Sequence, residues 1–411
     1  MERGSLLDII LRIKSLQTGI WEHVRRRLET LNPPIEDDTT NLTPVLQTIE
    51  ARLAEYISID KPGEATRLFV SQLTREHMRK TLSFFISVTK DQKPVPFQDV
   101  GTGTLNTLVL ALLSFIAELK EENVIFAMEE PEIALAPHTQ RRIATYLLTK
   151  TTQCFVTSHS PYIIETFNPS QILILRRDEN ATVKGTQITL GSTVKTKTYR
   201  RYLRRGIAEA MLGKGVIIVE GITEQIVLKA VAEKLEEDDS DKYPLDLSGI
   251  TIITTDGDGS IHEFGQFFHS LDLPTFAFFD KKKRSETERE ALNDAQFEIL
   301  NEIPYAGMED LLIRELPLKH QWTYLEHIRD NDIAPKIGIP SEQPIDTKIC
   351  ELTRNVLKDG KGWGRAAELI DLCSVIELPI TIVSFLEQIY IRFPKPKIPD
   401  IEMLPKNRTA G

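Results

Sequence analysis

Cysteine is scarce in this chain. Only three cysteines occur among the 411 residues, at Cys154, Cys350 and Cys373, and no two of them have the short spacing of a metal-binding or redox pair. A zinc site and a disulfide framework are therefore not expected, and the free thiols fit a reducing compartment. We predict a cytoplasmic protein.

Long hydrophobic runs are missing as well. No apolar stretch reaches the roughly 20 residues that a membrane-spanning helix needs. The first residues, Met1 to Ser5, lack the basic-then-apolar pattern of a secretion signal. We therefore expect no membrane partner. The composition, with 41% hydrophobic and 27% charged residues, is that of a globular protein of two or three domains.

The chain also lacks a positive net charge. Its 60 acidic residues outnumber the 50 Lys and Arg residues, which gives a formal charge of −10. Any binding of nucleic acid would then depend on local basic patches. The stretch from Lys195 to Arg205 is one such patch, in which tyrosines alternate with cations. It could bind a DNA backbone or form the solvated face of a helix, and the pattern does not separate the two.

Acidic residues follow the apolar segments in the second half of the chain. Residues 215–219 are rich in valine and isoleucine, which is typical of a buried parallel strand. Glu220 ends this run, Gly221 follows as a turn, and Thr223 is predicted to cap the next helix. Glu224 would then lie in the first turn of that helix, at the same end of the strand as Glu220.

Two further apolar segments end in the same way. Residues 250–255 precede Asp256 and Asp258, and residues 275–279 precede Asp280. Parallel strands bring their carboxyl ends to one edge of a sheet, and carboxylates crowded there repel unless a cation neutralises them. The pattern therefore predicts a Mg²⁺ or Mn²⁺ site. The alternative is an ordinary doubly wound sheet with solvated acids at its rim.

This order of strands, acids and helices resembles the Toprim domain of topoisomerases, primases and OLD (overcoming lysogenisation defect) nucleases. The form Glu220-Gly-x-Thr-Glu224 is most similar to that of the OLD nucleases. The resemblance implies a Rossmann-like parallel sheet, and it adds Glu309 to the metal ligands. The predicted ligand set is Glu220, Glu224, Asp280 and Glu309, with Asp256 and Asp258 as further candidates.

The sequence departs from the Toprim pattern directly after Asp280. Toprim domains generally carry Asp-x-Asp there, whereas this chain has Lys282 in place of the second Asp. A second metal ion is therefore in question: Asp256 or Asp258 could substitute, or the site could use one ion. The four cations Lys281, Lys282, Lys283 and Arg284 could hold a DNA backbone beside the site. The alternative is a solvated loop.

A late lysine belongs to the same resemblance. In OLD-like nucleases a lysine before a late helix completes the site, and Lys361 is the better match here, with Lys358 as the fallback. Its charge would stabilise the negative charge that builds up on the phosphate in the transition state. The alternative is an ordinary exposed lysine.

The first half of the chain carries a second constellation. A Gly101-Thr-Gly103 loop precedes an apolar helix predicted from Leu108, and two predicted strands end near Glu129-Glu130 and His159. This order resembles the distal half of an ABC-type ATPase, with the heads of OLD and RecF-like proteins as the nearest relatives. Each piece alone is a common turn, rim or structural histidine.

The resemblance assigns nucleotide-site roles to these residues. The glycine loop would face the γ-phosphate of a partner subunit, Glu129 would hold Mg²⁺ through water, and Glu130 would orient or deprotonate the attacking water. His159 would contact the γ-phosphate. The implied nucleotide-binding set is Gly101, Thr102, Gly103, Glu129, Glu130 and His159.

One motif of such ATPases is absent. The sequence contains no Gly-x-x-x-x-Gly-Lys-Ser/Thr, the Walker A loop that cradles the β- and γ-phosphates. We expect that upstream residues or a separate chain supply this loop, and that ATP is a cofactor only in that case. Alone, the chain is not expected to hydrolyse ATP, and its ATPase-like half would serve as a scaffold or dimer surface.

These observations predict an α/β protein, with the distal half of an ABC-like ATPase followed by a Toprim domain and a small helical C-terminal appendage. The predicted boundaries are 1–190 for the partial ATPase domain with its helical arm, 191–212 for a basic linker, 213–330 for the Toprim domain and 331–411 for the appendage that completes its site.

The resemblance implies a metal-dependent DNA endonuclease in phage defence or DNA repair, with Glu220, Lys361 and Glu130 as catalytic residues. Its expected partners are DNA, a second copy joined at the ATPase-like part, and a helicase or defence protein as a further candidate. A catalytically decayed DNA-binding, sensor or scaffold protein is the alternative, which Lys282 and the missing Walker A loop favour. Strand-passage or primase chemistry ranks last, because we recognise no domain with a nucleophilic tyrosine.

Overall fold

The computed structural model describes ten stretches of the chain, which are residues 6–14, 42–59, 65–70, 82–87, 93–120, 125–177, 180–188, 206–255, 260–361 and 364–396. Asp256, Asp258 and the basic patch from Lys195 to Arg205 lie outside these stretches. The chain divides into two compact units, Met1–Phe167 and Asn168–Gly411. Among the helices in the described stretches, none has the length and apolarity needed to cross a membrane.

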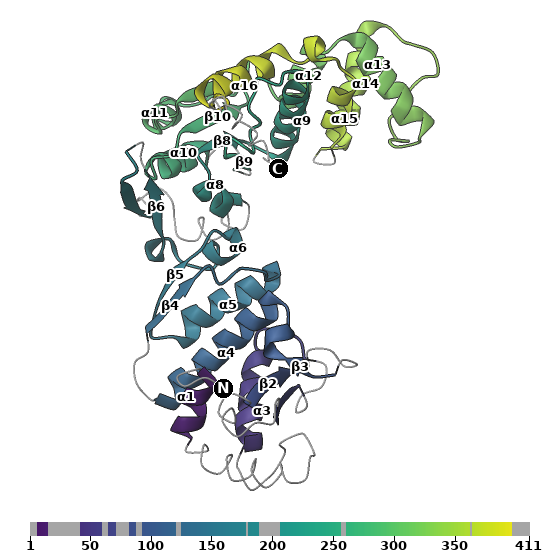
Figure 1. Cartoon of the computed structure of the whole chain (residues 1–411). Helices are drawn as coiled ribbons and strands as arrows, with labels where there is room; N and C mark the ends of the chain where they lie inside the picture. The colour runs from purple at the N-terminus through teal and green to yellow at the C-terminus, as the bar shows by residue number, and fades with distance from the viewer. Residues whose placement is uncertain are drawn as a thin grey trace, which may run out of the picture. The chain divides into compact units, whose positions relative to one another are not determined.

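The first unit begins with helices that pack on a small antiparallel sheet (Figure 1). Its first described elements are α1 (Leu6–Ile13), α3 (Leu42–Ala54), β1 (Thr66–Val70), β2 (Leu82–Ile86), β3 (Val95–Pro96) and α4 (Thr102–Lys120). The sequence pattern did not assign residues 69–89, which the structure shows to include most of this sheet. Helix α4 starts at Thr102, earlier than the predicted start at Leu108, so the glycine loop forms its first turn.

The first unit also contains a parallel pair of strands, as the sequence predicted. Strands β4 (Ile125–Glu129) and β5 (Gln153–Thr157) pair in parallel, and α5 (Pro137–Lys150) connects them. A short helix, α6 (Pro161–Ile164), follows. Burial alternates along both strands, which is typical of a sheet with one covered face. Parallel pairing brings the carboxyl ends of β4 and β5, and the residues that follow them, to one edge.

The second unit is organised around a parallel sheet of four strands in the order β11-β10-β8-β9. These strands are β8 (Gly215–Val219), β9 (Ile250–Thr254), β10 (Thr275–Phe279) and β11 (Ile299–Glu302). Every residue of β8 and β10 is buried, because helices cover both faces of a parallel sheet. The carboxyl ends of the two central strands therefore lie side by side.

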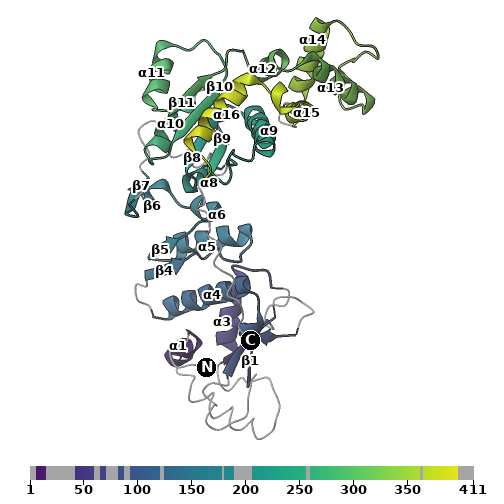
Figure 2. The same cartoon turned by 45° about the horizontal axis from the view of Figure 1, so that its top comes forward.

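Helices on the two faces of this sheet bury alternate residues of its strands. Ile217 and Val219 of β8 join the core formed with α9 (Ile222–Asp238), while α10 (Ile261–His269) packs against β8 and β10. Helix α16 (Ile380–Arg392) lies beside α9 and the sheet (Figures 1 and 2). Its Phe385 ring packs 5.1 Å from the ring of Phe278 in β10.

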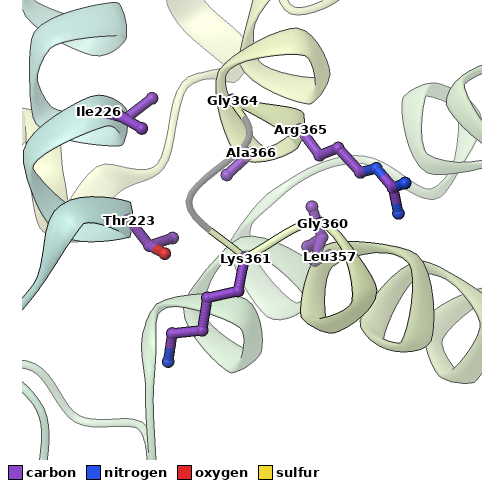
Figure 3. Close-up of a pocket in the computed structure, with 8 residues that line it drawn as sticks. All are labelled: Thr223, Ile226, Leu357, Gly360, Lys361, Gly364, Arg365 and Ala366. Carbon is purple, nitrogen blue, oxygen red and sulfur yellow. The ribbon is translucent and has the colours of Figure 1, made fainter.

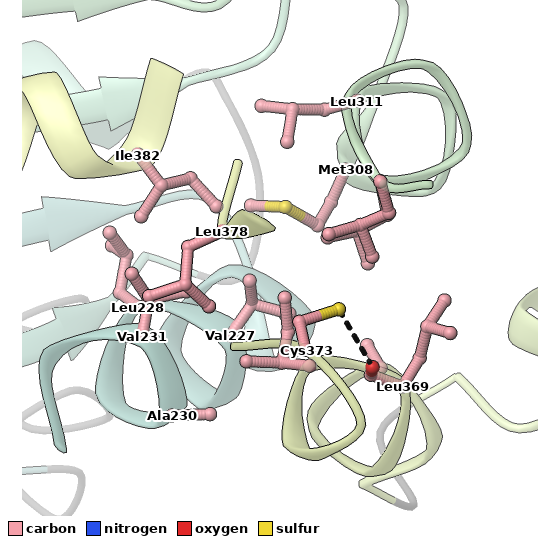
Figure 4. Packing of buried hydrophobic residues seen from close by; sticks show 14 of the residues in the cluster. Val227, Leu228, Ala230, Val231, Met308, Leu311, Leu369, Cys373, Leu378 and Ile382 are labelled. Carbon is pink, nitrogen blue, oxygen red and sulfur yellow. Dashed lines mark hydrogen bonds between the residues drawn. The ribbon is translucent and has the colours of Figure 1, made fainter. Parts of the chain in front are cut away.

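The C-terminal helices share the core of the sheet. The described elements are α11 (Glu286–Asp294), α12 (Met308–Glu315), α13 (Leu318–Asp330), α14 (Asp346–Asp359), α15 (Arg365–Asp371) and α16. Side chains of α9, α12, α15 and α16 meet in one hydrophobic cluster. Figure 4 shows part of it, with the Cys373 thiol donating to the carbonyl oxygen of Leu369 at 3.6 Å. The segment predicted as an appendage is thus continuous with the sheet's core.

The first boundary differs from the predicted one. The chain divides between Phe167 and Asn168 rather than near residue 190. The antiparallel strands β6 (Leu173–Arg177) and β7 (Val183–Gln187) therefore belong to the second unit. Arg176 donates to the carbonyl oxygens of Leu271 and Met211, and these hydrogen bonds tie β6 to the unit that contains the parallel sheet.

Candidate active site

Glu220 and Asp280 follow the two central strands of the sheet and lie in contact. Val219 of β8 is in register with Phe278 of β10, one residue before the end of that strand. The backbone N–H of Asp280 donates to Glu220 Oε1 at 2.9 Å. Glu220 is only 8% exposed, so its carboxylate depends on partners from the protein rather than on water.

Glu224 approaches the same edge from α9. The helix begins at Ile222 with Gly221 as its N-cap, so Thr223 is not the cap that the sequence predicted. Glu224 is 5% exposed. Burial raises the pKa of Glu224, and the negative charges of Glu220 and Glu309 raise it further, whereas Lys361 acts in the opposite direction. The carboxylates of Glu220 and Glu309, which come from two other elements, therefore influence the protonation of Glu224.

Glu309 enters the site from the first turn of α12. Glu309 Oε2 and Asp280 Oδ2 lie 3.3 and 3.4 Å from the point that a Cβ atom on Gly307 would occupy. Any larger residue at 307 would insert a carbon atom beside both carboxylates. Gly307 is therefore a residue of the site that our sequence reasoning missed, although its place just before Glu309 could have indicated it.

Asp280 is the most strongly perturbed of these acids. Burial raises its pKa to about 7, with further contributions from Glu224, Glu220 and Glu309, while Lys282 opposes the increase. Asp280 Oδ1 is buried and has no hydrogen-bond partner among the described residues. Since buried polar atoms are almost always paired, this oxygen is suited to a ligand that the polypeptide itself does not supply.

Two cations of the loop after β10 contact Glu220. Lys282 Nζ lies 2.5 Å from Glu220 Oε2, and Arg284 Nη2 lies 3.7 Å from Glu220 Oε1. The Arg284 side chain is only 6% exposed and stacks on the Phe279 ring, with its guanidinium carbon 4.6 Å from the ring centroid. It also pairs with Glu302.

These contacts differ from the role predicted for the loop. The Arg284 side chain is buried and paired inside the protein, so its placement does not suit a contact with a DNA backbone. The Lys282 ammonium faces Glu220. Lys281 and Lys283 are exposed and remain candidates for such a contact, whereas Lys282 is partly exposed and paired with Glu220.

The donor set fits a divalent cation in chemistry. Carboxylate oxygens are the ligands that Mg²⁺ and Mn²⁺ prefer, and Asp280 Oδ1 is a buried acceptor that needs a partner. Within the described residues, however, no three Asp, Glu, His or Cys side chains are close enough together to hold a metal ion as they are placed. Ligation would therefore require the carboxylates to move closer together.

Lys361 lies at the other side of the acidic group. Its Nζ is 3.8 Å from Glu309 Oε1, and its side chain is 64% exposed. It comes from the connection between α14 and α15 and lines a pocket with Thr223 and Ile226 of α9. Figure 3 shows the Lys361 and Arg365 side chains pointing in opposite directions from this connection. Among the described residues, Lys358, the fallback candidate, forms no ion pair with these acids.

The first unit brings together three of the predicted nucleotide-site residues. Glu129 ends β4, and Glu130 follows with its backbone N–H donating to Thr157 O at 2.9 Å. The φ angle of Glu130 is 42°, in the left-handed region that non-glycine residues rarely adopt. His159 Nε2 lies 3.6 Å from Glu130 Oε1. Such local strain is common at functional sites.

Comparison with known proteins agrees with this two-part organisation. Residues 211–281 match the family model of the TOPRIM domain of overcoming lysogenization defect protein-like proteins. Residues 11–164 match the AAA ATPase domain family. The Old nuclease of Escherichia phage P2 is 21% identical over 290 residues, which cover 66% of this chain and 48% of the relative. The chain thus combines an AAA ATPase-like region with an OLD-like TOPRIM domain, and it is similar to OLD proteins over both parts.

Three further proteins show similarity to parts of the chain. Endonuclease GajA of Bacillus cereus is 19% identical over 219 residues, covering 52% of this chain and 37% of the relative. The chain thus spans about half or less of the length of these two curated relatives. Among solved structures, the C-terminal region of the Xanthomonas campestris OLD protein is 22% identical, with a TM-score of 0.32. The match covers 45% of this chain and 96% of that structure. The C-terminal region of the Burkholderia pseudomallei OLD protein is 15% identical, with a TM-score of 0.32. The match covers 44% of this chain and 98% of that structure.

The glycine loop packs against the segment that follows β4. Asn106 Nδ2 donates to Ile133 O at 3.1 Å. A Cβ atom on Gly103 would lie 2.3 Å from the carbonyl oxygen of Ala134, whereas one on Gly101 would meet nothing within 4 Å. Gly103 therefore permits a close backbone contact, and Gly101 leaves an open approach to the helix N-terminus.

Substitution of the two glycines is expected to separate these roles. Gly103→Ala should lower the free energy of unfolding by about 1–3 kcal/mol because the backbone must shift, although alanine is the better helix former by about 1 kcal/mol. Gly101→Ala should leave the stability unchanged. Thermal unfolding of both variants measures the difference, and equal stability of Gly103→Ala and the parent chain would contradict the inferred contact.

Proposed function

We propose that this chain is a metal-dependent endonuclease that hydrolyses phosphodiester bonds in DNA. One observation carries the proposal: the partly buried Asp280 carboxylate, whose Oδ1 is buried without a partner among the described residues, lies near Glu220, Glu224 and Glu309 at the edge of the sheet. The names of the two curated relatives, Old nuclease and endonuclease GajA, support the same activity. We further propose a cytoplasmic role in phage defence or DNA repair.

The four acids are proposed to form one site for a divalent metal ion. Asp280, Glu224 and Glu309 would hold Mg²⁺ or Mn²⁺, with Glu220 at its side. When bound, such an ion lowers the pKa of a water molecule and withdraws charge from the scissile phosphate. Lys361 would contact a phosphate oxygen and stabilise the charge that develops there. Burial of Glu220 and Glu224 excludes water from the inner side of the site.

The ATPase-like unit is proposed to serve assembly. Glu129, Glu130 and His159 would face a nucleotide only if a Walker A loop came from elsewhere, with Gly101, Thr102 and Gly103 turned to the nucleotide of a second copy. A homodimer joined at this unit is then the proposed assembly, with a helicase or defence protein as a further candidate partner.

One observation favours the competing function, a DNA-binding or scaffold protein without catalysis. Lys282 already neutralises Glu220, and a site that balances its own charge has less need of a metal ion. This alternative predicts binding to DNA without cleavage in either Mg²⁺ or Mn²⁺.

Plasmid cleavage distinguishes the two functions, and α12 offers a matched pair of variants. Glu309→Gln should reduce nicking or linearisation of supercoiled plasmid by about a thousandfold, because it removes a proposed ligand. Asp310→Asn, one residue further along, should retain activity because Asp310 pairs with Arg354 at 2.7 Å. EDTA should abolish cleavage by the parent chain.

Two results of these assays would contradict the proposal. If the folded parent chain binds DNA but does not cleave it in Mg²⁺ or Mn²⁺, the scaffold function is the correct one. If Glu309→Gln cleaves as fast as Asp310→Asn, the proposed ligand set is wrong.

A further inference from the structure

Lys282 places a fixed positive charge inside the acidic group. It stands two residues after Asp280, and its ammonium returns to the sheet edge to lie 2.5 Å from Glu220 Oε2. The other oxygen of Glu220 accepts the Asp280 backbone N–H at 2.9 Å. Both oxygens of Glu220 are therefore engaged by groups of the chain itself.

Contacts of Arg284 and Glu302 hold the loop that carries Lys282 in place. Arg284 Nη2 donates to the carbonyl oxygen of Asp280 at 3.0 Å, and its guanidinium pairs with Glu302 and stacks on Phe279. The Lys282 backbone N–H lies 3.5 Å from Glu302 Oε1. These contacts connect the loop to Asp280 and Glu302, so the backbone of Lys282 stays close to the acidic group.

The charges divide the acidic group into two parts. Glu220 is balanced by Lys282 at 2.5 Å and Arg284 at 3.7 Å. The Lys361 ammonium lies 3.8 Å from Glu309, and the charge of Lys282 also acts on Asp280, but Asp280 Oδ1 has no partner among the described residues. The part formed by Asp280, Glu224 and Glu309 therefore keeps a buried acceptor oxygen that a cation could occupy.

We propose that the Lys282 ammonium takes the place of a second divalent ion, so that the acidic group binds one ion per chain, held by Asp280, Glu224 and Glu309. A second ion on Glu220 would have to displace an ammonium in direct contact with the carboxylate, or lie beside it against like-charge repulsion. The inference rests on the proposed function, since it assumes that the acids bind a divalent ion.

The number of tightly bound Mn²⁺ ions tests this inference without reference to activity. Calorimetric titration of the nucleotide-free chain with Mn²⁺ is expected to show one tight site per chain. Lys282→Asp should raise the number to two, because it removes the ammonium and adds a ligand oxygen. Lys281→Asp makes the same charge change on an exposed neighbour and should leave the number at one.

Thermal unfolding keeps the test valid if Lys282→Asp does not fold. In metal-free buffer, Lys282→Met should unfold several degrees below the parent chain, because the buried Glu220 loses its nearest cation. Saturating Mn²⁺ should raise the unfolding temperature of Lys282→Met by more than it raises that of the parent. An equal Mn²⁺ shift in both proteins would overturn the inference.

The outcomes separate the two proposals. Two tight Mn²⁺ sites in the parent chain, or a single site in Lys282→Asp, would overturn the role of Lys282 and leave the nuclease proposal intact. If the parent binds no Mn²⁺, or if Glu309→Gln binds it as tightly as the parent does, the proposed metal site itself fails, and the role of Lys282 fails with it.

Discussion

Asp280→Asn is expected to abolish DNA cleavage and, at the same time, to make the metal-free protein more stable above pH 7. The raised pKa of Asp280, about 7 in place of 3.8, means that the folded chain binds this proton more strongly than the unfolded chain. Stability therefore falls as the pH rises from about 4 to 7, and the loss is complete above pH 7. Asparagine cannot ionise and avoids this loss.

The stability gained by Asp280→Asn depends on how far the pKa of Asp280 is raised and on how well water screens its charge. Each pKa unit corresponds to about 1.4 kcal/mol, but the carboxyl group is only partly buried and water screens it. We therefore expect Asp280→Asn to gain about 1–2 kcal/mol at pH 8 and almost nothing at pH 4. Urea denaturation in EDTA at the two pH values measures this difference, and plasmid cleavage should fall by about a thousandfold.

The same carboxyl group should make Mn²⁺ binding depend on pH. Protons compete with the ion for Asp280, so the apparent Mn²⁺ affinity should weaken by at most about tenfold per unit as the pH falls below 7. Asp310→Asn serves as the control, since Asp310 lies outside the acidic group and pairs with Arg354. If Asp280→Asn is less stable than the parent at pH 8, Asp280 does not carry an uncompensated charge.

The sequence predicted the central sheet well because each of its strands has a simple pattern. Strands β8, β9 and β10 are short segments rich in apolar and β-branched residues, and the structure places them within a residue of the predicted limits. A buried parallel strand needs apolar side chains on both faces, so its pattern does not depend on distant parts of the chain. The acids at the strand ends then follow from the topology alone.

Other parts depended on contacts that a linear pattern does not contain. Strands β1 and β2 lie in or beside a stretch of mixed apolar and basic residues, and among the described residues β1 pairs with β2, which also pairs with β3. The division of the chain at Phe167 depends on side chains such as Arg176, whose partners are Leu271 and Met211. The linear pattern of β6 does not contain these contacts.

The predicted site shows the same limit. Lys282 was recognised as a departure from the Toprim pattern, but its ion pair with Glu220 depends on the fold of the loop. The position of Gly307 two residues before Glu309 could have drawn attention to it, but its role becomes clear only from the two carboxylates that approach it. Residue types at strand ends could thus be predicted, whereas the pairing of charges among them could not.

Lys361→Met is expected to reduce DNA cleavage by a factor of about 10² to 10³ without destabilising the protein. Lys361 Nζ lies 3.8 Å from Glu309 Oε1, and its charge opposes the raised pKa of Glu224. An exposed ammonium beside the proposed metal ligands is placed to contact a phosphate oxygen. Because the side chain is 64% exposed, its loss should have little effect on the thermal unfolding temperature.

The backbone that carries Lys361 is held independently of the side chain. Arg365 is 8% exposed, and its Nη1 donates to Val356 O at 3.0 Å and to Asp359 Oδ2 at 2.8 Å. These bonds join the end of α14 to the start of α15 on either side of the connection. Lys361→Met therefore removes the charge and leaves the connection in place, so a loss of activity would report on the ammonium.

Lys358→Met provides the matched control. Lys358 lies in the last turn of α14, three residues before Lys361, and is also exposed. Its substitution should leave the cleavage rate within about twofold of the parent, since surface changes of this kind have small effects. Mn²⁺ affinity should be unchanged or slightly higher in Lys361→Met, because a positive charge near Glu309 and Glu224 is lost. Equal cleavage by the two variants would remove Lys361 from the proposed site, and a loss confined to Lys358→Met would transfer its role to that residue.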